Sequence, residues 1–332
     1  MGKEEGMEQL ERLCEEDFSW QFSMDDFLAS CDLAFRLYGE GVLENPPRVE
    51  RVERRGELDC FCLEMPARWP GRYQACKVIE EYSDVARGTL GERRARVLLE
   101  DLERQKRVEI DADYITDMRT GAAGALGVRY LASESVERVG ILGSGRIART
   151  LALAVDRLFA LKELKVYSRQ AENREAFVRR VGPQLRTELR AAADLKDCVQ
   201  DCDAVLTAVP TPRPILDSTA IEGKVYLVVM GGDSRTRQVA PELLERVGVV
   251  VDQLRQAEDS GEFAHARQTG RFNRISLVQD AAGEVLDIGD AACGRIEKGE
   301  NGPQLIYCTG LAVQDLCAGV MVYEHFLQKG VL

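Results

Sequence analysis

Residues 139–148, Val-Gly-Ile-Leu-Gly-Ser-Gly-Arg-Ile-Ala, constrain the fold of this chain more than any other segment. They place a Gly-x-Gly-x-x-Ala pattern directly after an apolar stretch and before a stretch whose apolar residues have helical spacing. In such a context Gly143 permits a tight turn from strand to helix, and Gly145 lets the backbone approach a pyrophosphate at the helix N-terminus. The segment therefore predicts the opening strand, turn and helix of a dinucleotide-binding domain, with a turn that holds no ligand as the alternative.

Four further apolar segments have the length of buried strands, and helical patterns separate them. They cover residues 164–169, 204–210, 225–233 and 249–252. Short apolar strands that alternate with helices are typical of a parallel, doubly wound sheet with helices on both faces. We therefore expect an α/β domain of the Rossmann type over residues 118–311.

The segments on either side of this region have a different pattern. Ser23 is the predicted N-cap of a helix that ends near Gly39. Alternating stretches then predict antiparallel strands, and an apolar helix near the C-terminus could return to pack on them; these elements cover residues 57–65, 73–79, 95–101 and 312–326. We expect a smaller α+β domain, built from residues 1–117 and 312–332, into which the Rossmann domain is inserted.

Composition excludes several classes of function. The 44 lysines and arginines against 56 aspartates and glutamates give a net charge of −12, which disfavours sequence-independent binding of nucleic acid. No apolar run reaches the roughly 18 residues of a membrane helix, and the first residues are acidic, so we expect a cytoplasmic protein. The ten cysteines lack Cys-x-x-Cys pairs and the two histidines lack partner motifs, so we expect reduced thiols and no metal site.

Lys77 lies within an apolar strand pattern, between Cys76 and Val78. Strand alternation puts Lys77 on the same face as Ala75 and Ile79. A lysine on an apolar face loses hydration, which lowers its pKa toward values that are useful in acid–base catalysis. The alternative is a lysine whose ammonium group reaches water.

Three further polar positions are candidates for contact with a ligand. Asp233 follows two glycines at the carboxyl end of a predicted parallel strand, the edge at which α/β sheets bind ligands. Arg119 and Thr120 are predicted to open a helix rich in alanine and glycine, where backbone amides favour an anion. Arg48 is a second candidate for a carboxylate clamp. The alternative for Asp233 is an aspartate that only forms a turn, and the alternative for each arginine is a surface residue without a ligand.

The second predicted strand of the Rossmann domain ends in Val-Tyr-Ser-Arg at residues 166–169. Ser168 and Arg169 stand where an NAD-specific site usually has an acidic residue, and together they could hold a 2′-phosphate. This favours NADP over NAD, with a solvated surface arginine as the alternative. The residues that we expect to contact NAD or NADP are Thr120, Gly143, Ser144, Gly145, Arg146, Ile147, Ser168, Arg169, Val209 and Gly232.

The order of these motifs resembles the ornithine cyclodeaminase/mu-crystallin family. The marks are Arg-Thr-Gly-Ala-Ala-Gly-Ala at residues 119–125, the Gly-Ser-Gly turn at 143–145, Gly-Gly-Asp at 231–233 and Thr-Gly-Leu-Ala-Val-Gln-Asp at 309–315. The resemblance covers residues 46–316. It implies a homodimer whose smaller domains pair through their sheets, so that residues 1–117 and 312–332 would bind substrate and mediate dimerisation.

The resemblance also implies roles for single residues. Arg48 and Arg119 would hold an α-carboxylate, and Thr120 would lie near the cofactor. Lys77 would act on the substrate nitrogen or on its hydration. Asp233 matches the acid–base residue of the cyclodeaminases, where it activates the attacking amine or water.

Two departures from the family pattern bear on the substrate. Leu63 stands where cyclodeaminases have an acidic residue, and Asp84 stands where an asparagine is usual. We therefore expect an NAD(P)-dependent oxidoreductase, of the amino-acid dehydrogenase or ketimine reductase type, that interconverts an α-amino acid and its imine or keto acid. The alternatives are an ornithine- or lysine-type cyclodeaminase that releases ammonia with catalytic NAD, and a non-catalytic protein that binds a small ligand together with NADPH.

Overall fold

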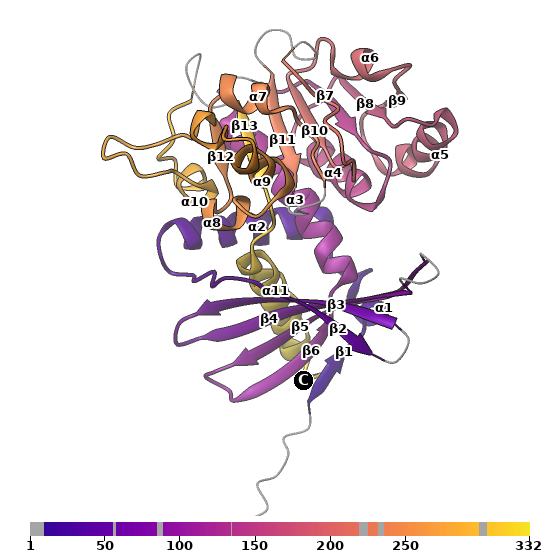
Figure 1. The fold of residues 1–332 in the computed structure, drawn as a ribbon. Coiled ribbons are helices and arrows are strands. Elements are labelled where there is room, and N and C mark those ends of the chain that lie inside the picture. The colour runs from indigo at the N-terminus through magenta and orange to yellow at the C-terminus, as the bar shows by residue number, and fades with distance from the viewer. Residues whose placement is uncertain are drawn as a thin grey trace, which may run out of the picture. The chain divides into compact units, whose positions relative to one another are not determined.

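The chain folds into two compact units (Figure 1). The computed structural model describes residues 10–55, 58–84, 89–133, 135–218, 225–231, 236–298 and 304–332. Unit 1 comprises Met1–Phe22, Val42–Thr116 and Ala312–Leu332, and unit 2 comprises Ser23–Gly41 and Asp117–Leu311.

Unit 1 is built on a six-stranded sheet. Its strands are β1 (Glu11–Leu13), β2 (Val49–Arg55), β3 (Leu58–Trp69), β4 (Tyr73–Asp84), β5 (Thr89–Asp101) and β6 (Lys106–Asp111). They lie in the order β1-β6-β5-β4-β3-β2, and all neighbours are antiparallel except β1, which runs parallel to β6. The helices of this unit are the short α1 (Glu15–Phe18) and the long α11 (Ala312–Gln328).

Alternation along β4 determines which face of the sheet α11 covers. Tyr73, Ala75 and Lys77 are buried, whereas the intervening Gln74 and Cys76 are more exposed. The ring of Tyr73 packs edge-on against that of Tyr323 in α11, with 6.4 Å between the centroids. Burial of one apolar strand face under an apolar helix is the main favourable contribution in such a layer. The expectation that the last helix packs on these strands is confirmed.

Strand β2 shows why the edge of this sheet was not predicted. Its seven residues, Val-Glu-Arg-Val-Glu-Arg-Arg, are all exposed. A strand with no buried face lacks the alternation by which strands are recognised in a sequence. Its charged side chains also oppose pairing with further strands at this edge.

Unit 2 contains a seven-stranded sheet in which every pair of neighbours is parallel. The strand order is β12-β13-β11-β10-β7-β8-β9. The strands are β7 (Arg138–Leu142), β8 (Glu163–Tyr167), β9 (Leu189–Ala191), β10 (Ala204–Thr207), β11 (Tyr226–Met230), β12 (Val249–Val251) and β13 (Leu305–Cys308). The predicted doubly wound α/β fold, inserted into a smaller α+β unit, is therefore confirmed.

Helices and short 3-10 turns complete unit 2. They are α2 (Met24–Gly39), α3 (Asp113–Leu131), α4 (Arg146–Leu158), α5 (Ala171–Val181), η1 (Gly182–Gln184), α6 (Leu195–Val199), α7 (Pro241–Arg246), α8 (Leu254–Ala257), α9 (Gly261–Gln268), η2 (Phe272–Arg274) and α10 (Ile288–Ala292). The first four residues of α3 are grouped with unit 1. Ser23 caps α2 through a capping box with Asp26, as its sequence position predicts.

Helix α2 belongs to unit 2, whereas the sequence-based boundaries placed residues 1–117 together. It packs on α10 so closely that a Cβ at Gly39 would overlap the carbonyl oxygen of Gly289. At its other end, Asp25 lies 3.6 Å from Arg157 of α4. The helix is amphipathic, so the sequence predicts a buried face but cannot specify which sheet layer covers it. Along the chain, unit 1 ends at Thr116 and unit 2 resumes at Asp117.

The strand order of unit 2 creates one place suited to ligand binding. The chain runs from β7 to β8 and β9 on one side, and later returns to β10 and β11 on the other side of β7. Ligands of open α/β sheets bind outside the carboxyl ends of the strands at such a reversal. The ends of β7 and β10 are therefore where a dinucleotide site is expected.

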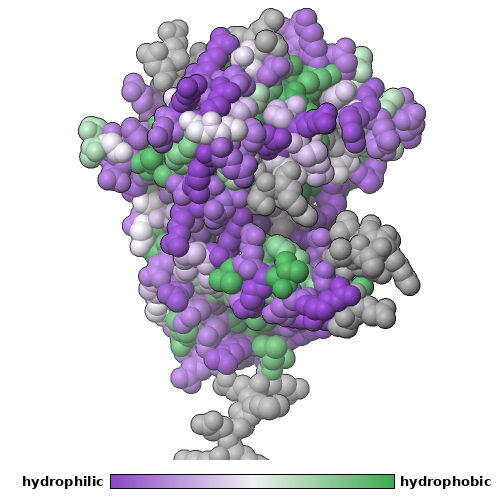
Figure 2. Space-filling view, in the orientation of Figure 1, coloured by the Kyte–Doolittle hydropathy of each residue, from purple (hydrophilic) through white to green (hydrophobic). Residues whose placement is uncertain are grey.

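Most of the surface visible in Figure 2 is hydrophilic. This agrees with the 30% of charged residues in the sequence. Within the described part of the chain, no helix has the length and hydropathy that a membrane span requires.

Candidate active site

A cavity of about 310 Å³ lies at the carboxyl ends of the central strands of unit 2. Its walls come from helix α3, the start of α4, the segments after β10 and β11, and the segment after β13. The lining residues are Arg119, Thr120, Ile147, Ala208, Val209, Pro210, Met230, Gly231, Thr236, Gln238, Cys308, Thr309 and Gly310. Four of the residues predicted to contact substrate or cofactor, Arg119, Thr120, Ile147 and Val209, thus line one cavity.

The glycine turn after β7 has two glycines with different constraints. Gly143 has a φ of +120°, and a Cβ there would lie 2.7 Å from the carbonyl oxygen of Ala208. Gly145, the N-cap of α4, has a φ of −87°, and a Cβ there would meet no atom of the described residues within 4 Å. Gly143 is therefore required by the fold, whereas Gly145 keeps space open in front of the helix N-terminus.

The neighbours of these glycines differ in exposure. Ser144 is half-buried, Ile147 faces the cavity, and Arg146 is exposed. The guanidinium group of Arg146 lies 3.1 Å from the carboxylate of Asp117. The side chain of Arg146 is thus held by α3.

The end of β8 carries the residues expected to select the nucleotide. Ser168 is half-buried and Arg169 is exposed. Arg174 stacks on Tyr167, with 5.2 Å from its Cζ to the ring centroid, and donates to the Ser168 carbonyl oxygen at 2.8 Å. Residues 167–170 include no carboxylate, so the NADP preference stays a prediction from this segment.

Helix α3 starts earlier than the sequence interpretation assumed. It begins at Asp113, so Arg119 and Thr120 lie in its second turn and not at its N-terminus. The Glu15 carboxylate accepts a hydrogen bond from the backbone N–H of Tyr114 at 3.1 Å and thereby satisfies an amide of the first turn. The prediction that helix N-terminal amides contribute to anion binding at Arg119 is therefore wrong. A ligand there would meet the Arg119 guanidinium group and the Thr120 hydroxyl without those amides.

The small residues of α3 allow a close helix contact. A Cβ at Gly121 would overlap the backbone of Thr150 in α4. Because Gly121 has no side chain, the two helix backbones approach each other closely and leave no gap. The contact brings Thr120 and Ile147 to the same cavity.

Gln238 joins the strand ends that form the floor of the cavity. Its Oε1 accepts hydrogen bonds from the Thr207 hydroxyl and the Val209 N–H, both at 2.8 Å, and its Nε2 donates to the Met230 carbonyl oxygen at 2.7 Å. Gln238 is 2% exposed. No periodicity or motif in the sequence indicates this role, because it depends on three segments that meet only in the fold.

Tyr307 and Glu262 form a buried hydrogen-bonded pair beneath Gly231. The Tyr307 hydroxyl donates to the carboxylate of Glu262, and a Cβ at Gly231 would overlap the Tyr307 ring. Burial raises the pKa of Glu262 and that of Tyr307. Sequence reasoning missed both residues; it identified Gly231 only as part of the Gly-Gly-Asp motif.

Two of the predicted site residues lie outside the described residues. They are Gly232 and Asp233, and Gly231 directly before them is described. The N–H of Gly231 donates to the Cys308 carbonyl oxygen at 2.8 Å.

Unit 1 supplies two further predicted site residues. Lys77 is 1% exposed, and its Nζ lies 2.7 Å from Oδ2 of Asp315, which is equally buried. The predicted desolvation of Lys77 is confirmed, and the sequence did not identify its carboxylate partner. Arg48 is half-buried, with its Nε 3.3 Å from Glu50.

Residues 9–330 match the sequence model of the ornithine cyclodeaminase/mu-crystallin family. The chain belongs to this family. An alanine dehydrogenase of Archaeoglobus fulgidus is 28% identical over 323 residues, which cover 96% of each chain. An L-lysine cyclodeaminase of Streptomyces rapamycinicus is 28% identical over 246 residues, 72% of this chain and 71% of the relative.

A solved structure supports the same assignment at the level of the fold. It is an archaeal alanine dehydrogenase dimer with bound NAD, 26% identical to this chain, with a TM-score of 0.81 and 97% of each chain covered. This member of the ornithine cyclodeaminase/mu-crystallin family therefore shares its fold over nearly the whole length.

The residues of this family member fit a dinucleotide at the cavity. The space in front of Gly145 is the space that a pyrophosphate needs, because any side chain there would fill it. Ile147, at the start of α4, and Val209, after β10, supply apolar walls at the reversal of strand order. The geometry of the turn and the cavity is therefore compatible with a dinucleotide bound to unit 2.

Histidine chemistry is not supported at this site. His265, on α9, is half-buried and does not line the cavity. Partial burial and the nearby Arg237 and Arg271 lower its pKa. Among the described residues, one group has the spacing of metal ligands, Cys14, Glu16 and Asp111 in unit 1; Arg12 already lies 3.1 Å from the Asp111 carboxylate.

Proposed function

We propose that this protein is an NAD(P)-dependent oxidoreductase that interconverts an α-amino acid and its imine or keto acid. One observation carries the proposal: Arg119 and Thr120 line the same cavity as Ile147 of the glycine turn and Val209 after β10. A guanidinium group able to bind a carboxylate would thus lie beside a nicotinamide bound in this cavity. The relatives named alanine dehydrogenase and L-lysine cyclodeaminase support the same substrate class, amino acids.

The residues of this chain would divide the work between binding and proton transfer. The turn at Gly143–Gly145 would bind the pyrophosphate, and Ser168 with Arg169 would meet the adenosine ribose. The family resemblance assigns the α-carboxylate to Arg119 and Arg48, which would hold it by charge-assisted hydrogen bonds. A bound nicotinamide supplies or accepts the hydride at the α-carbon of the substrate.

Proton transfer is assigned to two side chains by the family resemblance. Lys77 would hold or move a proton at the substrate nitrogen, or at the water that adds to the carbon. Its burial against Asp315 keeps its ammonium group in a fixed position. Asp233 would act as a second acid–base group, and its role rests on the sequence motif alone.

The test is the ratio of nucleotide reduced to ammonia released. The purified protein is given L-alanine, L-ornithine, L-lysine and a panel of other amino acids, each with NAD⁺ and with NADP⁺. We expect a ratio near one for at least one amino acid, together with nucleotide oxidation by the matching imine or by keto acid plus ammonia. These outcomes would establish the oxidoreductase.

Other outcomes would assign a different activity. Ammonia without net nucleotide reduction would establish a cyclodeaminase, the function that the Gly-Gly-Asp motif favours. Tight NADPH binding without turnover across the panel would establish a binding protein. Either result would overturn the proposal.

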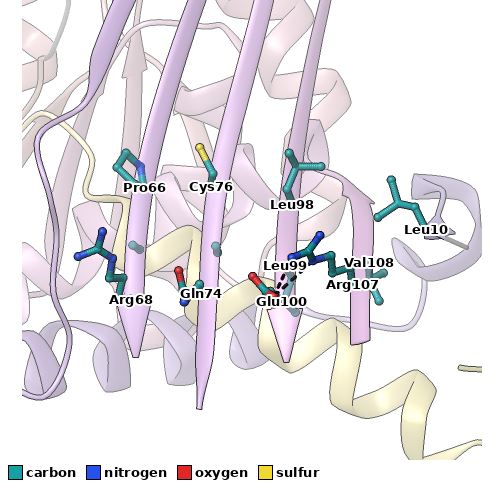
Figure 3. Close-up of a pocket in the computed structure, with 12 residues that line it drawn as sticks. Leu10, Pro66, Arg68, Gln74, Cys76, Leu98, Leu99, Glu100, Arg107 and Val108 are labelled. Atoms are coloured by element: carbon teal, nitrogen blue, oxygen red, sulfur yellow. Dashed lines mark hydrogen bonds and ion pairs between the residues drawn. The ribbon is translucent and has the colours of Figure 1, made fainter. Parts of the chain in front are cut away.

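We also propose that the protein is a homodimer that pairs through the open face of the unit 1 sheet. Helix α11 covers one face, and the other face carries a cavity of about 420 Å³ whose apolar walls include Leu10, Pro66, Cys76 and Leu98. Figure 3 shows Pro66, Cys76 and Leu98 side by side on neighbouring strands. A second copy would remove these side chains from water, and the archaeal alanine dehydrogenase is a dimer.

The thiols support a reducing compartment. None of the ten cysteines forms a disulfide, and most are buried. Proteins that retain many unpaired cysteines are typical of the cytosol, where disulfides are rare. We therefore propose a cytoplasmic location.

A further inference from the structure

The turn at Thr309–Gly310, which forms part of the cavity wall, is held by an unusual concentration of hydrogen bonds. It follows β13, next to β12 in the sheet, and Asp252 follows β12. Asp252 Oδ2 accepts from the N–H groups of Thr309 at 2.6 Å and Gly310 at 2.7 Å. Its Oδ1 accepts from the Thr309 hydroxyl at 2.8 Å and the Gln253 N–H at 2.9 Å. Four donors thus satisfy one carboxylate that is 1% exposed.

Gln256 holds the same turn from its other side. Its Nε2 donates to the Thr309 hydroxyl oxygen and to the Gly310 carbonyl oxygen, each at 2.7 Å. The Thr309 hydroxyl therefore donates to Asp252 and accepts from Gln256, and both the N–H and the C=O of Gly310 are bonded. A turn fixed at these atoms has little freedom to shift.

The turn lies against the Arg119 guanidinium group. Gly310 has a φ of +87°, and a Cβ there would lie 2.9 Å from Arg119 Nη1 and 3.3 Å from Nη2. Arg119 is 6% exposed. Holding a long arginine side chain in one rotamer costs conformational entropy, which contacts around the side chain must offset. The backbone of Gly310 supplies one side of the slot in which the guanidinium group lies.

We propose that Asp252 and Gln256 are positioning residues that hold Arg119 in place through the Thr309–Gly310 turn, and so set the affinity of the site for a substrate carboxylate. This rests on the proposed function, which assigns the carboxylate to Arg119. A guanidinium group pre-set in one orientation binds a carboxylate without first losing rotamer freedom. Neither Asp252 nor Gln256 needs to touch the substrate for this effect.

The structure offers a matched pair of glycines for the test. Gly283 has the same φ of +87° as Gly310, but within the described part of the chain a Cβ there would meet no atom within 4 Å. Gly310→Ala and Gly283→Ala therefore both place an alanine at a φ of +87°, and only the former pushes on Arg119. We expect Gly310→Ala to raise the KM for the amino acid about tenfold or more, with the nucleotide KM unchanged, because a charged hydrogen-bonding partner is displaced.

Gly283→Ala should leave both KM values unchanged. If Gly310→Ala leaves the amino-acid KM unchanged, or raises the nucleotide KM by the same factor, the positioning role is wrong. A crystal structure of Gly310→Ala adds a readout independent of turnover: Arg119 should be displaced from its orientation in the wild type. An unmoved Arg119 would overturn the inference even if the wild type acts on no amino acid, an outcome that by itself rejects only the proposed function.

Variants of the hydrogen-bonding residues test the other half of the inference. Gln256→Met keeps the side-chain volume and removes both donated bonds, and Thr309→Val removes the hydroxyl while keeping its shape. Both should raise the amino-acid KM more than they lower kcat, whereas Thr309→Ser should restore the wild-type KM. Asp252→Asn should act in the same direction; if it does not fold, the Gln256 and Thr309 variants decide. Equal KM values for Thr309→Val and Thr309→Ser would contradict the role of the turn.

Discussion

Lys77 Nζ lies 2.7 Å from Asp315 Oδ2 inside unit 1, and each side chain is 1% exposed. The pair joins strand β4 to the first turn of α11. Removing one member of a buried ion pair costs far more stability than replacing both members by apolar groups. The pair therefore couples the placement of the proposed proton-transfer group to the packing of the C-terminal helix.

Removal of either member of this pair should destabilise the protein. We expect Lys77→Met and Asp315→Asn each to lower the free energy of unfolding by about 3–5 kcal/mol, because the remaining charge is left without its counter-charge. The double variant Lys77→Met/Asp315→Leu should regain most of that stability and show no turnover. Urea unfolding and steady-state rates check this. Full turnover in Lys77→Met would remove Lys77 from the mechanism.

The two glycines of the turn should respond differently to alanine. Gly143→Ala should cost about 1–3 kcal/mol of stability, because its φ of +120° and the nearby Ala208 oxygen both oppose a side chain. Gly145→Ala should leave stability nearly unchanged and weaken nucleotide binding, because its Cβ enters the space in front of α4. Thermal unfolding and fluorescence titration with NADH and NADPH measure the two effects. Equal nucleotide affinity in Gly145→Ala and wild type would place the pyrophosphate elsewhere.

Arg169 should distinguish NADPH from NADH. We expect Arg169→Ala to weaken NADPH binding about tenfold or more and to leave NADH binding unchanged, since a guanidinium–phosphate hydrogen bond is lost only with NADPH. Arg180→Ala, which removes an exposed arginine on α5, is the control. Titration of the three proteins with both nucleotides is the measurement. A loss of the same size for NADH would mean that Arg169 does not contact a 2′-phosphate.

Glu262 should make stability depend on pH. Burial raises its pKa in the native protein, whereas an unfolded glutamate has a pKa of about 4.3. The native state thus binds the proton more tightly, so the stability due to this group decreases as the pH rises from about 4.3 through the raised pKa. A glutamine at position 262 cannot titrate. The free energy of unfolding of Glu262→Gln should therefore decrease less than that of the wild type over this pH interval.

Urea unfolding between about pH 4 and pH 8 measures this difference. Glu172→Gln, at an exposed glutamate of α5, should follow the wild type. A Glu262→Gln curve parallel to that of the wild type would show that burial does not hold the proton on Glu262.

The open sheet face of unit 1 should control association. Leu98 is 39% exposed there, and Leu98→Arg would place a charge where the proposed partner packs. We expect a dimer for the wild type and a monomer for Leu98→Arg in light scattering coupled to size exclusion. Val331→Arg, at an exposed apolar residue near the C-terminus, should remain dimeric. A monomeric wild type, or a dimeric Leu98→Arg variant, would contradict the proposed interface.

The elements that the sequence predicted share one property: their signal is local. The Gly-Ser-Gly turn, the apolar parallel strands and the Ser23 cap are each specified within a few adjacent residues. Edge strand β2 was missed because its exposed residues carry no alternation. The start of α3 was placed too late, and its true start at Asp113 is capped by Glu15, a residue distant in sequence.

The sequence by itself determined the Rossmann topology and the turn in which Gly143 is obligatory. For Lys77 it offered a desolvated amine and, as the alternative, an amine that reaches water. Tertiary structure alone decided which groups satisfy the buried polar atoms: Asp315 for Lys77, Gln238 for the ends of β10 and β11, and Asp252 for the Thr309–Gly310 turn. It also decided that α2 packs in unit 2. The reason is physical: periodicity encodes which face is buried, whereas hydrogen-bond and ion-pair partners are fixed only when distant segments come within about 3 Å of each other.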